Sequence, residues 1–166
     1  MTMEATHHSP RFGTDPALSF VTRAAFLAIL NAVAFSTMNG WLVALAVVVD
    51  VGMVLPLLGD MFAAVAYRAG RTSLRRSGLE VDEVVPGRAG RFLAFDTAAG
   101  KVFVDGRVRD IDAIRTAQWI REGRQVYVEI TFGDGLGAMT RLPVRDDYEG
   151  AEAVAAICRL ADLSFD

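Results

Sequence analysis

The sequence has very few of the side chains from which metal centres and nucleophilic active sites are built. Of its 166 residues, one is a cysteine and two are histidines. The single Cys158 excludes an internal disulfide and any site with several cysteine ligands. His7 and His8 are adjacent near the N-terminus with only Glu4 close by, which is too little for a metal site. We therefore predict that the chain is not an enzyme and holds no metal or cofactor.

Two other patterns that often mark functional sites are weak here. The glycine-rich segment 133–137 resembles a phosphate-binding loop, but it lacks the lysine and the following helix that such a loop needs. Strand-like segments flank it, so we interpret it as a hairpin turn. A net charge of −3, without a basic face, gives little support to nucleic-acid binding.

Charged residues are also scarce between residues 18 and 67, which form the longest apolar stretch. The chain is 52% hydrophobic with a mean hydropathy of +0.32, and this excess lies almost entirely in its first half. A membrane-crossing helix needs about 20 residues. Residues 18–38 and 41–58 approach or meet that length, 61–67 can extend the second, and Asn39 and Gly40 form a turn between them. The stretch therefore predicts a two-helix transmembrane hairpin, preceded by a flexible tail over residues 1–17.

Three other interpretations of this stretch are weaker. Residues 24–35 resemble the core of a signal peptide, with a cleavage-like site around Ser36, but the apolar sequence resumes at Trp41 and continues. A soluble helical hairpin would be apolar on one face only, whereas these helices are apolar all round. An interfacial helix would have a strongly polar face, and none is visible.

The distribution of arginines predicts the orientation. Arginines flank the hairpin on both sides, whereas the turn has neither lysine nor arginine. The positive-inside rule then places both termini in the cytoplasm, with the chain in the inner membrane of a bacterium. Residues 68–78 are a basic juxtamembrane linker, and we expect its arginines to lie against lipid headgroups. The arginines before the first helix are Arg11 and Arg23, and those after the second are Arg68, Arg71, Arg75 and Arg76.

Small residues recur at every fourth position on both apolar helices. This spacing lets membrane helices approach closely, so it predicts packing within the hairpin or between copies in a homo-oligomer. The first helix has Ala24, Ala28, Ala32 and Ser36, and the second has Ala44, Val48, Gly52 and Pro56.

Four polar residues lie at positions where a bilayer makes them costly. Asp50 falls near the middle of the second helix, and counting outward from the turn brings Asn31 to a similar depth. We expect these two to pair, either as a structural clasp or as part of a proton or ion path. The same count brings Arg23 close enough to Asp60 for an interhelical ion pair.

From residue 79 onward the pattern changes from helical to alternating. Strand-like segments are separated by turns rich in glycine and proline, and the clearest one, 125–132, would bury every second residue from Val126. Asp146 or Asp147 can cap a final helix, on whose apolar stripe Cys158 lies. The expected strands are 79–85, 91–96, 101–105, 108–111, 114–120, 125–132 and 139–144.

A meander of about six short strands followed by one helix resembles the pleckstrin-homology-like (PH-like) domains that bacterial proteins carry on a membrane hairpin. The segments that suggest it are 92–96, 101–105 and 111–119, within residues 79–166. The resemblance is architectural and includes no diagnostic motif. It implies an α+β cytoplasmic domain that binds proteins or lipids.

We therefore expect a membrane-anchored, non-enzymatic binding or scaffold protein with membrane lipids and a protein, or a second copy, as partners. The alternative is a subunit of a membrane complex or transporter that uses Asp50 and Asn31 to couple protons or ions.

Overall fold

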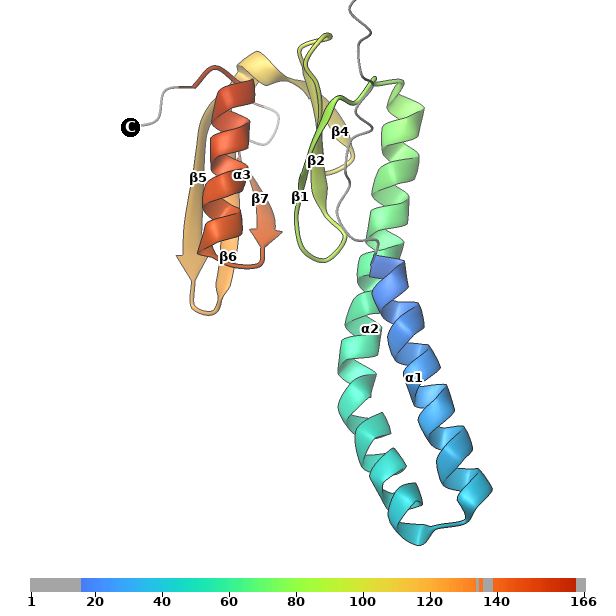
Figure 1. The fold of residues 1–166 in the computed structure, drawn as a ribbon. Coiled ribbons are helices and arrows are strands. Elements are labelled where there is room, and N and C mark those ends of the chain that lie inside the picture. The colour runs from blue at the N-terminus through green and yellow to red at the C-terminus, as the bar shows by residue number, and fades with distance from the viewer. Residues whose placement is uncertain (1–15, 134, 136–138, 164–166) are drawn as a thin grey trace, which may run out of the picture.

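The computed structural model describes residues 16–133, 135 and 139–163. Two long helices, α1 (Pro16–Thr37) and α2 (Gly40–Ser77), form an antiparallel hairpin beside a β-rich domain that ends in α3 (Asp147–Leu160) (Figure 1). The predicted hairpin is confirmed as a pair of helices. Helix α1 begins at Pro16, inside the predicted tail, because proline suits the first position of a helix. The rest of that tail, with His7, His8 and Arg11, lies outside the described residues.

The turn between the helices lies at the predicted position. Met38 takes a positive φ of 50°, and Asn39 caps α2 by accepting a hydrogen bond from the backbone N–H of Trp41 at 3.0 Å. Pro56 lies within α2 without ending it, and Gly78 ends the helix in the left-handed conformation. The predicted linker 68–78 is therefore helical up to Ser77, and α2, at 38 residues, is about 57 Å long.

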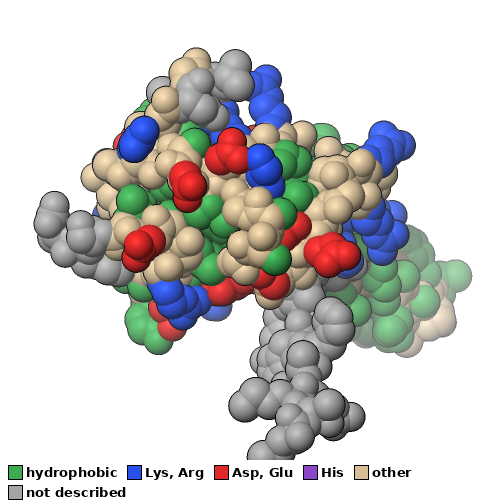
Figure 2. Space-filling model, turned by 90° about the horizontal axis from the view of Figure 1, so that it is seen from above, with side chains coloured by type: hydrophobic (Ala, Val, Ile, Leu, Met, Phe, Trp, Pro, Cys, Tyr) green, Lys and Arg blue, Asp and Glu red, His purple; other side chains and the backbone are tan. Residues whose placement is uncertain are grey.

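Both helices are apolar and exposed on most of their surface. Each is long and apolar enough to cross a membrane, and in each only 6% of the most apolar 18-residue window is buried. Figure 2 shows apolar side chains on the visible part of the hairpin, whereas the domain face in the foreground carries interspersed acidic and basic side chains. A surface of this kind is compatible with lipid as its surroundings.

The seam between α1 and α2 is not the one predicted from the small residues. Ala28, Ala32 and Ser36 are exposed, and a Cβ on Gly52 would have no neighbour within 4 Å. A spacing of four advances about 40° around the helix at each step, so these rows leave the seam. The residues of α1 that do turn inward alternate between spacings of three and four; they are Ala24, Leu27, Asn31 and Ala34.

Seven strands form two antiparallel sheets, one for each of the predicted strand segments. The first sheet has the order β1-β2-β3-β4 and the second the order β5-β6-β7. A short 3₁₀ turn, η1 (Ile111–Ala113), joins them. Most predicted strands are confirmed within two residues, but the first begins four residues later than expected, at Glu83. The strands are β1 (Glu83–Pro86), β2 (Phe92–Asp96), β3 (Lys101–Val104), β4 (Arg107–Asp110), β5 (Ile114–Glu122), β6 (Gln125–Phe132) and β7 (Met139–Val144).

The main core lies between the two sheets and α3. The face predicted for β6 is confirmed: Val128 is fully buried, whereas Glu129 on the opposite face is only half-buried. Asp146 caps α3 by accepting a hydrogen bond from the N–H of Glu149 at 3.0 Å. The core residues come from β1, β2, β3, β6, β7, η1, the start of β5 and α3, and they include Val85, Leu93, Phe95, Val104, Ile130, Leu142 and Ile157.

The first sheet is covered on both faces. Leu93 and Phe95 of β2 point into the core, while Phe92 and Ala94 point the other way and pack with Tyr67 and other residues of α2 in a second apolar cluster. All five residues of β2 are buried, which explains why its sequence is an apolar run and not an alternation. The end of α2 is therefore part of the domain.

Candidate functional site

The structure brings the predicted polar pair Asn31 and Asp50 together in the middle of the hairpin. The Nδ2 atom of Asn31 lies 3.0 Å from both carboxylate oxygens of Asp50, and 3.0 Å from the backbone carbonyl oxygen of Leu27. Asn31 and Asp50 are both half-buried between the helices. The amide thus satisfies the carboxylate within one chain, which is the geometry of a clasp.

The second predicted pair lies near the other end of α1. Nη1 of Arg23 is 2.9 Å from Oδ2 of Asp60, and the hydroxyl of Ser19 donates to the same oxygen at 3.1 Å. The carboxylate is the more buried partner, with its side chain 20% exposed against 42% for the arginine. Two partners on α1 therefore hold one carboxylate of α2 where the hairpin meets the β domain.

Just beyond Asp60, α2 is fastened to the β domain at two points. The ring of Tyr67 meets that of Phe92 edge to face, with centroids 5.9 Å apart. Gly90 approaches the backbone of α2 so closely that a Cβ on it would lie 2.1 Å from the carbonyl oxygen of Ala63. Because Gly90 has a φ of +75°, only glycine suits both its conformation and its surroundings.

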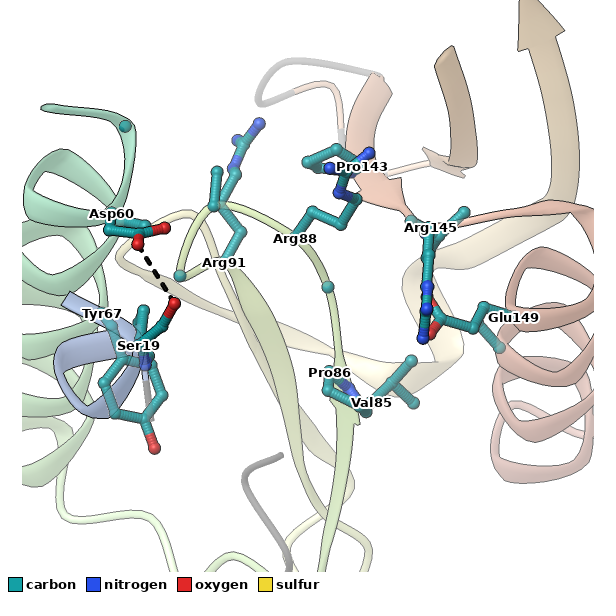
Figure 3. A pocket seen from close by; sticks show the side chains of 18 of the residues that line it. Ser19, Asp60, Tyr67, Val85, Pro86, Arg88, Arg91, Pro143, Arg145 and Glu149 are labelled. Atoms are coloured by element: carbon teal, nitrogen blue, oxygen red, sulfur yellow. Dashed lines mark hydrogen bonds between the residues drawn. The ribbon is translucent and has the colours of Figure 1, made fainter. Parts of the chain in front are cut away.

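An open groove of about 1400 Å³ lies between the hairpin and the β domain. One wall is the start of α1 with the middle of α2, the other is α3 with β7, and the β1–β2 turn lies between them (Figure 3). In Figure 3, Ser19, Asp60 and Tyr67 lie on the hairpin side and Arg145 and Glu149 on the α3 side. This groove brings together parts of the chain that are far apart in sequence.

Acidic and basic side chains both line the groove, and half of them are in ion pairs. Arg23 binds Asp60, Arg91 binds Asp105, and Glu83 binds Arg159 at 2.6 Å. The carboxylate of Glu149 accepts a hydrogen bond from the N–H of Arg145 at 2.8 Å.

The carboxylate of Glu152 raises the pKa of Tyr148 through a hydrogen bond. The side chains of Arg88 and Arg145 are exposed and make no ion pair within the described residues. Glu149 and Glu152, which also line the groove, likewise make no ion pair within the described residues, so the charges without an ion pair are of both signs.

The four arginines predicted to contact the membrane lie on the last turns of α2. The Cζ atom of Arg71 lies 5.8 Å from the centroid of the Tyr67 ring, as in a cation–π contact. A hollow of about 300 Å³ adjoins three of the four; its lining includes Arg68, Arg71, Thr72 and Arg75, but not Arg76.

The other candidates from the sequence do not form a functional site in the described residues. Cys158 is buried, and burial raises the pKa of its thiol, as expected for a core residue. The described residues include no cluster of three or more His, Cys, Asp or Glu side chains that could hold a metal. Strands β6 and β7, on either side of the segment 133–137, pair antiparallel; most of the segment itself lies outside the described residues.

The groove itself could not be located from the sequence. The segment Pro86–Arg91, with two glycines and two arginines, is recognisable only as a turn. Its place in the lining of the groove depends on a contact between this turn and β7. There the backbone N–H of Arg88 donates a hydrogen bond to the carbonyl oxygen of Pro143 at 2.7 Å. The two arginines in this turn, Arg88 and Arg91, were the sequence feature that could have indicated a binding surface.

Comparisons with known proteins identify no family. No family model matches the chain, and no curated protein matches its sequence. Three solved chains match in structure. One belongs to a structure of the Spt16D–Pob3N heterodimer, with 19% sequence identity and a TM-score of 0.34 over 42% of this chain and 78% of that chain. A likeness of this degree implies no shared function.

Proposed function

We propose that this chain is a membrane-anchored, non-enzymatic binding or scaffold protein that holds a small β domain at the cytoplasmic surface of a bacterial inner membrane. The observation that carries the proposal is that α2 continues without a break from the exposed apolar hairpin into the side of the β domain. An anchor joined in this way fixes the position of the domain.

The membrane placement is supported by the exposure of the hairpin. Large apolar side chains face outward all along both helices, such as Ile29 at 65% and Val51 at 71% exposed. In water this surface would be far larger than the apolar patches that soluble monomers tolerate. The arginines on the last turns of α2, together with the lack of basic residues at the turn between the helices, favour cytoplasmic termini.

The binding role is supported by the domain and by the groove. Four strands, then three, then a closing helix agree with the PH-like layout that the sequence resembles, and such domains mostly bind proteins or lipids. The groove adds an open cavity with unpaired positive charge at Arg88 and Arg145. We therefore place the binding surface between the anchor and the domain.

Fractionation and reporter fusions test the anchoring. The full chain is expected to resist extraction of membranes with alkaline carbonate. A reporter active only in the cytoplasm is expected to work when fused after Asp166, and a periplasmic reporter when inserted between Asn39 and Gly40. Release by carbonate, or a periplasmic C-terminus, would contradict the proposal.

Photo-cross-linking in intact membranes tests the groove. A benzophenone amino acid at Glu152, in the groove wall, is expected to give a discrete protein or lipid adduct that is lost on Arg88→Glu. The same probe at Ala98, in the exposed β2–β3 turn, is the matched control and is expected to give no such adduct. Equal labelling from both positions would show that the groove is not a binding surface.

The alternative function, proton or ion coupling through Asp50, receives less support. The amide of Asn31 contacts both oxygens of the carboxylate, which favours a clasp that stabilises the hairpin. A coupling role would make titration of Asp50 indispensable, and substitution by asparagine distinguishes the two roles.

A further inference from the structure

The position of the β1–β2 turn relative to the membrane anchor follows from its contact with α2. Gly90 of this turn packs on the backbone of Ala63 and Tyr67, only three to seven residues past Asp60. At 1.5 Å per residue this is about 5 to 10 Å along the helix. In Figure 1 the turn lies beside the point where α1 begins. The turn is therefore level with the end of the hairpin.

At this level the other faces of α2 are still apolar and exposed. Phe62 is 67% and Val65 is 61% exposed, and Leu18 near the start of α1 is 66% exposed. No charged residue occurs in α2 between Asp60 and Arg68. If the bilayer covers these apolar side chains, its interfacial layer extends past Ala63 and reaches the β1–β2 turn.

The edge of the domain that faces the same side carries exposed arginines. The β1–β2 turn, the β5–β6 turn and the junction of β7 with α3 all point toward the hairpin end of the molecule (Figure 1). Each contributes an exposed arginine without an ion pair among the described residues: Arg88, Arg124 and Arg145.

Three of the acidic side chains nearby already have partners. Asp147 is paired with Arg121, and Glu122 lies 2.8 Å from Nη1 of Arg141. Asp146 accepts the capping hydrogen bond of α3.

We propose that the β1–β2 turn is immersed in the interfacial layer of the bilayer, with Arg88 bound to anionic lipid headgroups, so that the groove opens directly onto the membrane. This inference rests on the proposed membrane anchoring. Exposed Pro86 and Ala89 give the turn an apolar surface beside Arg88, a combination suited to an interface. A basic side chain near an anionic membrane surface is attracted to it. A ligand would then reach the groove laterally, from the bilayer.

Spin labels on the full chain test this immersion. In a Cys158→Ala background, a nitroxide is attached at Ala89→Cys or, as the matched control, at Ala98→Cys in the β2–β3 turn. Both proteins are reconstituted in vesicles of phosphatidylglycerol and phosphatidylcholine, and near-ultraviolet circular dichroism confirms that both are folded. The measured quantity is the collision rate with oxygen, which enters lipid, divided by that with a water-soluble nickel chelate.

The label at residue 89 is expected to give a ratio severalfold higher than the label at residue 98, and Arg88→Glu is expected to lower it toward the control. Equal ratios at the two sites, in a protein that still resists carbonate, would overturn the immersion and leave the anchoring intact. Release by carbonate would overturn the anchoring itself. An unchanged ratio in Arg88→Glu would overturn the role given to Arg88.

Discussion

Replacing Gly90 with alanine tests whether α2 and the β domain form one unit. The new Cβ would lie 2.1 Å from the carbonyl oxygen of Ala63 and 2.9 Å from the backbone nitrogen of Tyr67, both atoms of a helix backbone that cannot yield locally. Overpacking of this kind costs roughly 1–3 kcal/mol. A left-handed conformation costs an alanine roughly another 1–2 kcal/mol, while the stiffer unfolded chain offsets about 0.4–1 kcal/mol.

Gly106→Ala is the matched control for this change. Gly106 has a φ of +80°, close to the +75° of Gly90, and a Cβ there would have no neighbour within 4 Å. Both variants share the conformational terms, so their difference isolates the close approach, about 1–3 kcal/mol, or roughly a fivefold to hundredfold change in an opening equilibrium.

Hydrogen exchange of the full chain in nanodiscs measures this opening at the β1–β2 turn and at residues 67–74. Faster exchange at both segments in Gly90→Ala, beyond that in Gly106→Ala, is expected, because the two surfaces separate together. The reasoning is refuted if the two variants exchange alike, or if only the turn is affected.

Three further predictions concern the core, the hairpin and the cysteine. Val128→Asp is expected to abolish cooperative unfolding of the domain because it buries an unpaired charge, whereas Glu129→Lys is expected to leave it folded; equal damage, seen by circular dichroism, would contradict the assigned faces. Asp50→Asn is expected to keep protein level and function, and Asp50→Leu to be tolerated when Asn31→Leu accompanies it; loss of function at a normal level in the membrane would instead support coupling through the carboxyl. Burial raises the pKa of the Cys158 thiol, so folding favours the neutral thiol over the thiolate. This preference contributes in full to the free energy of unfolding below the pKa of the unfolded state, and the contribution declines as the pH rises through the pKa of the folded state. Iodoacetamide is expected to label it at pH 8 only after unfolding, and rapid labelling of the native protein would show that it is accessible.

The sequence predicted those features that depend on neighbours along the chain. The turn at Asn39, the capping of α3 by Asp146 and the buried face of β6 follow from local residue types and from periodicity, and all three are confirmed. Counting residues outward from the tight turn also predicted that Asn31 lies near Asp50, because the two helices of an antiparallel hairpin cannot shift far along each other.

Features that depend on long-range packing could not be predicted. The row of small residues suggested the wrong seam within the hairpin, because alanine also occurs at exposed positions of these helices and the seam includes Leu27. Nothing local indicates that β2 is covered on its outer face by α2, or that Gly90 meets Ala63. The groove follows from these contacts, so the sequence alone could not locate it.

One stripe of side chains on α2 explains how the hairpin and the β domain are joined. Its inward-facing residues alternate between spacings of four and three along nearly the whole helix, so they stay on one face. The first part of this stripe packs on α1 and the second part on the first sheet, so one continuous stripe contacts both partners, one after the other along α2. The residues are Ala46, Asp50, Met53, Leu57, Asp60, Ala64, Tyr67, Arg71 and Leu74.

The groove lies where the contacts of this stripe change from α1 to the β domain. Helix α1 begins at Pro16, about one turn before Ser19, which binds Asp60, and the β1–β2 turn packs on α2 close to this level, at Ala63. The start of α1 and the β1–β2 turn thus meet α2 side by side and leave a gap whose floor is that helix. The ion pair of Arg23 with Asp60 stands at this boundary. It therefore holds the end of α1 in place against α2, and with it one wall of the proposed binding surface.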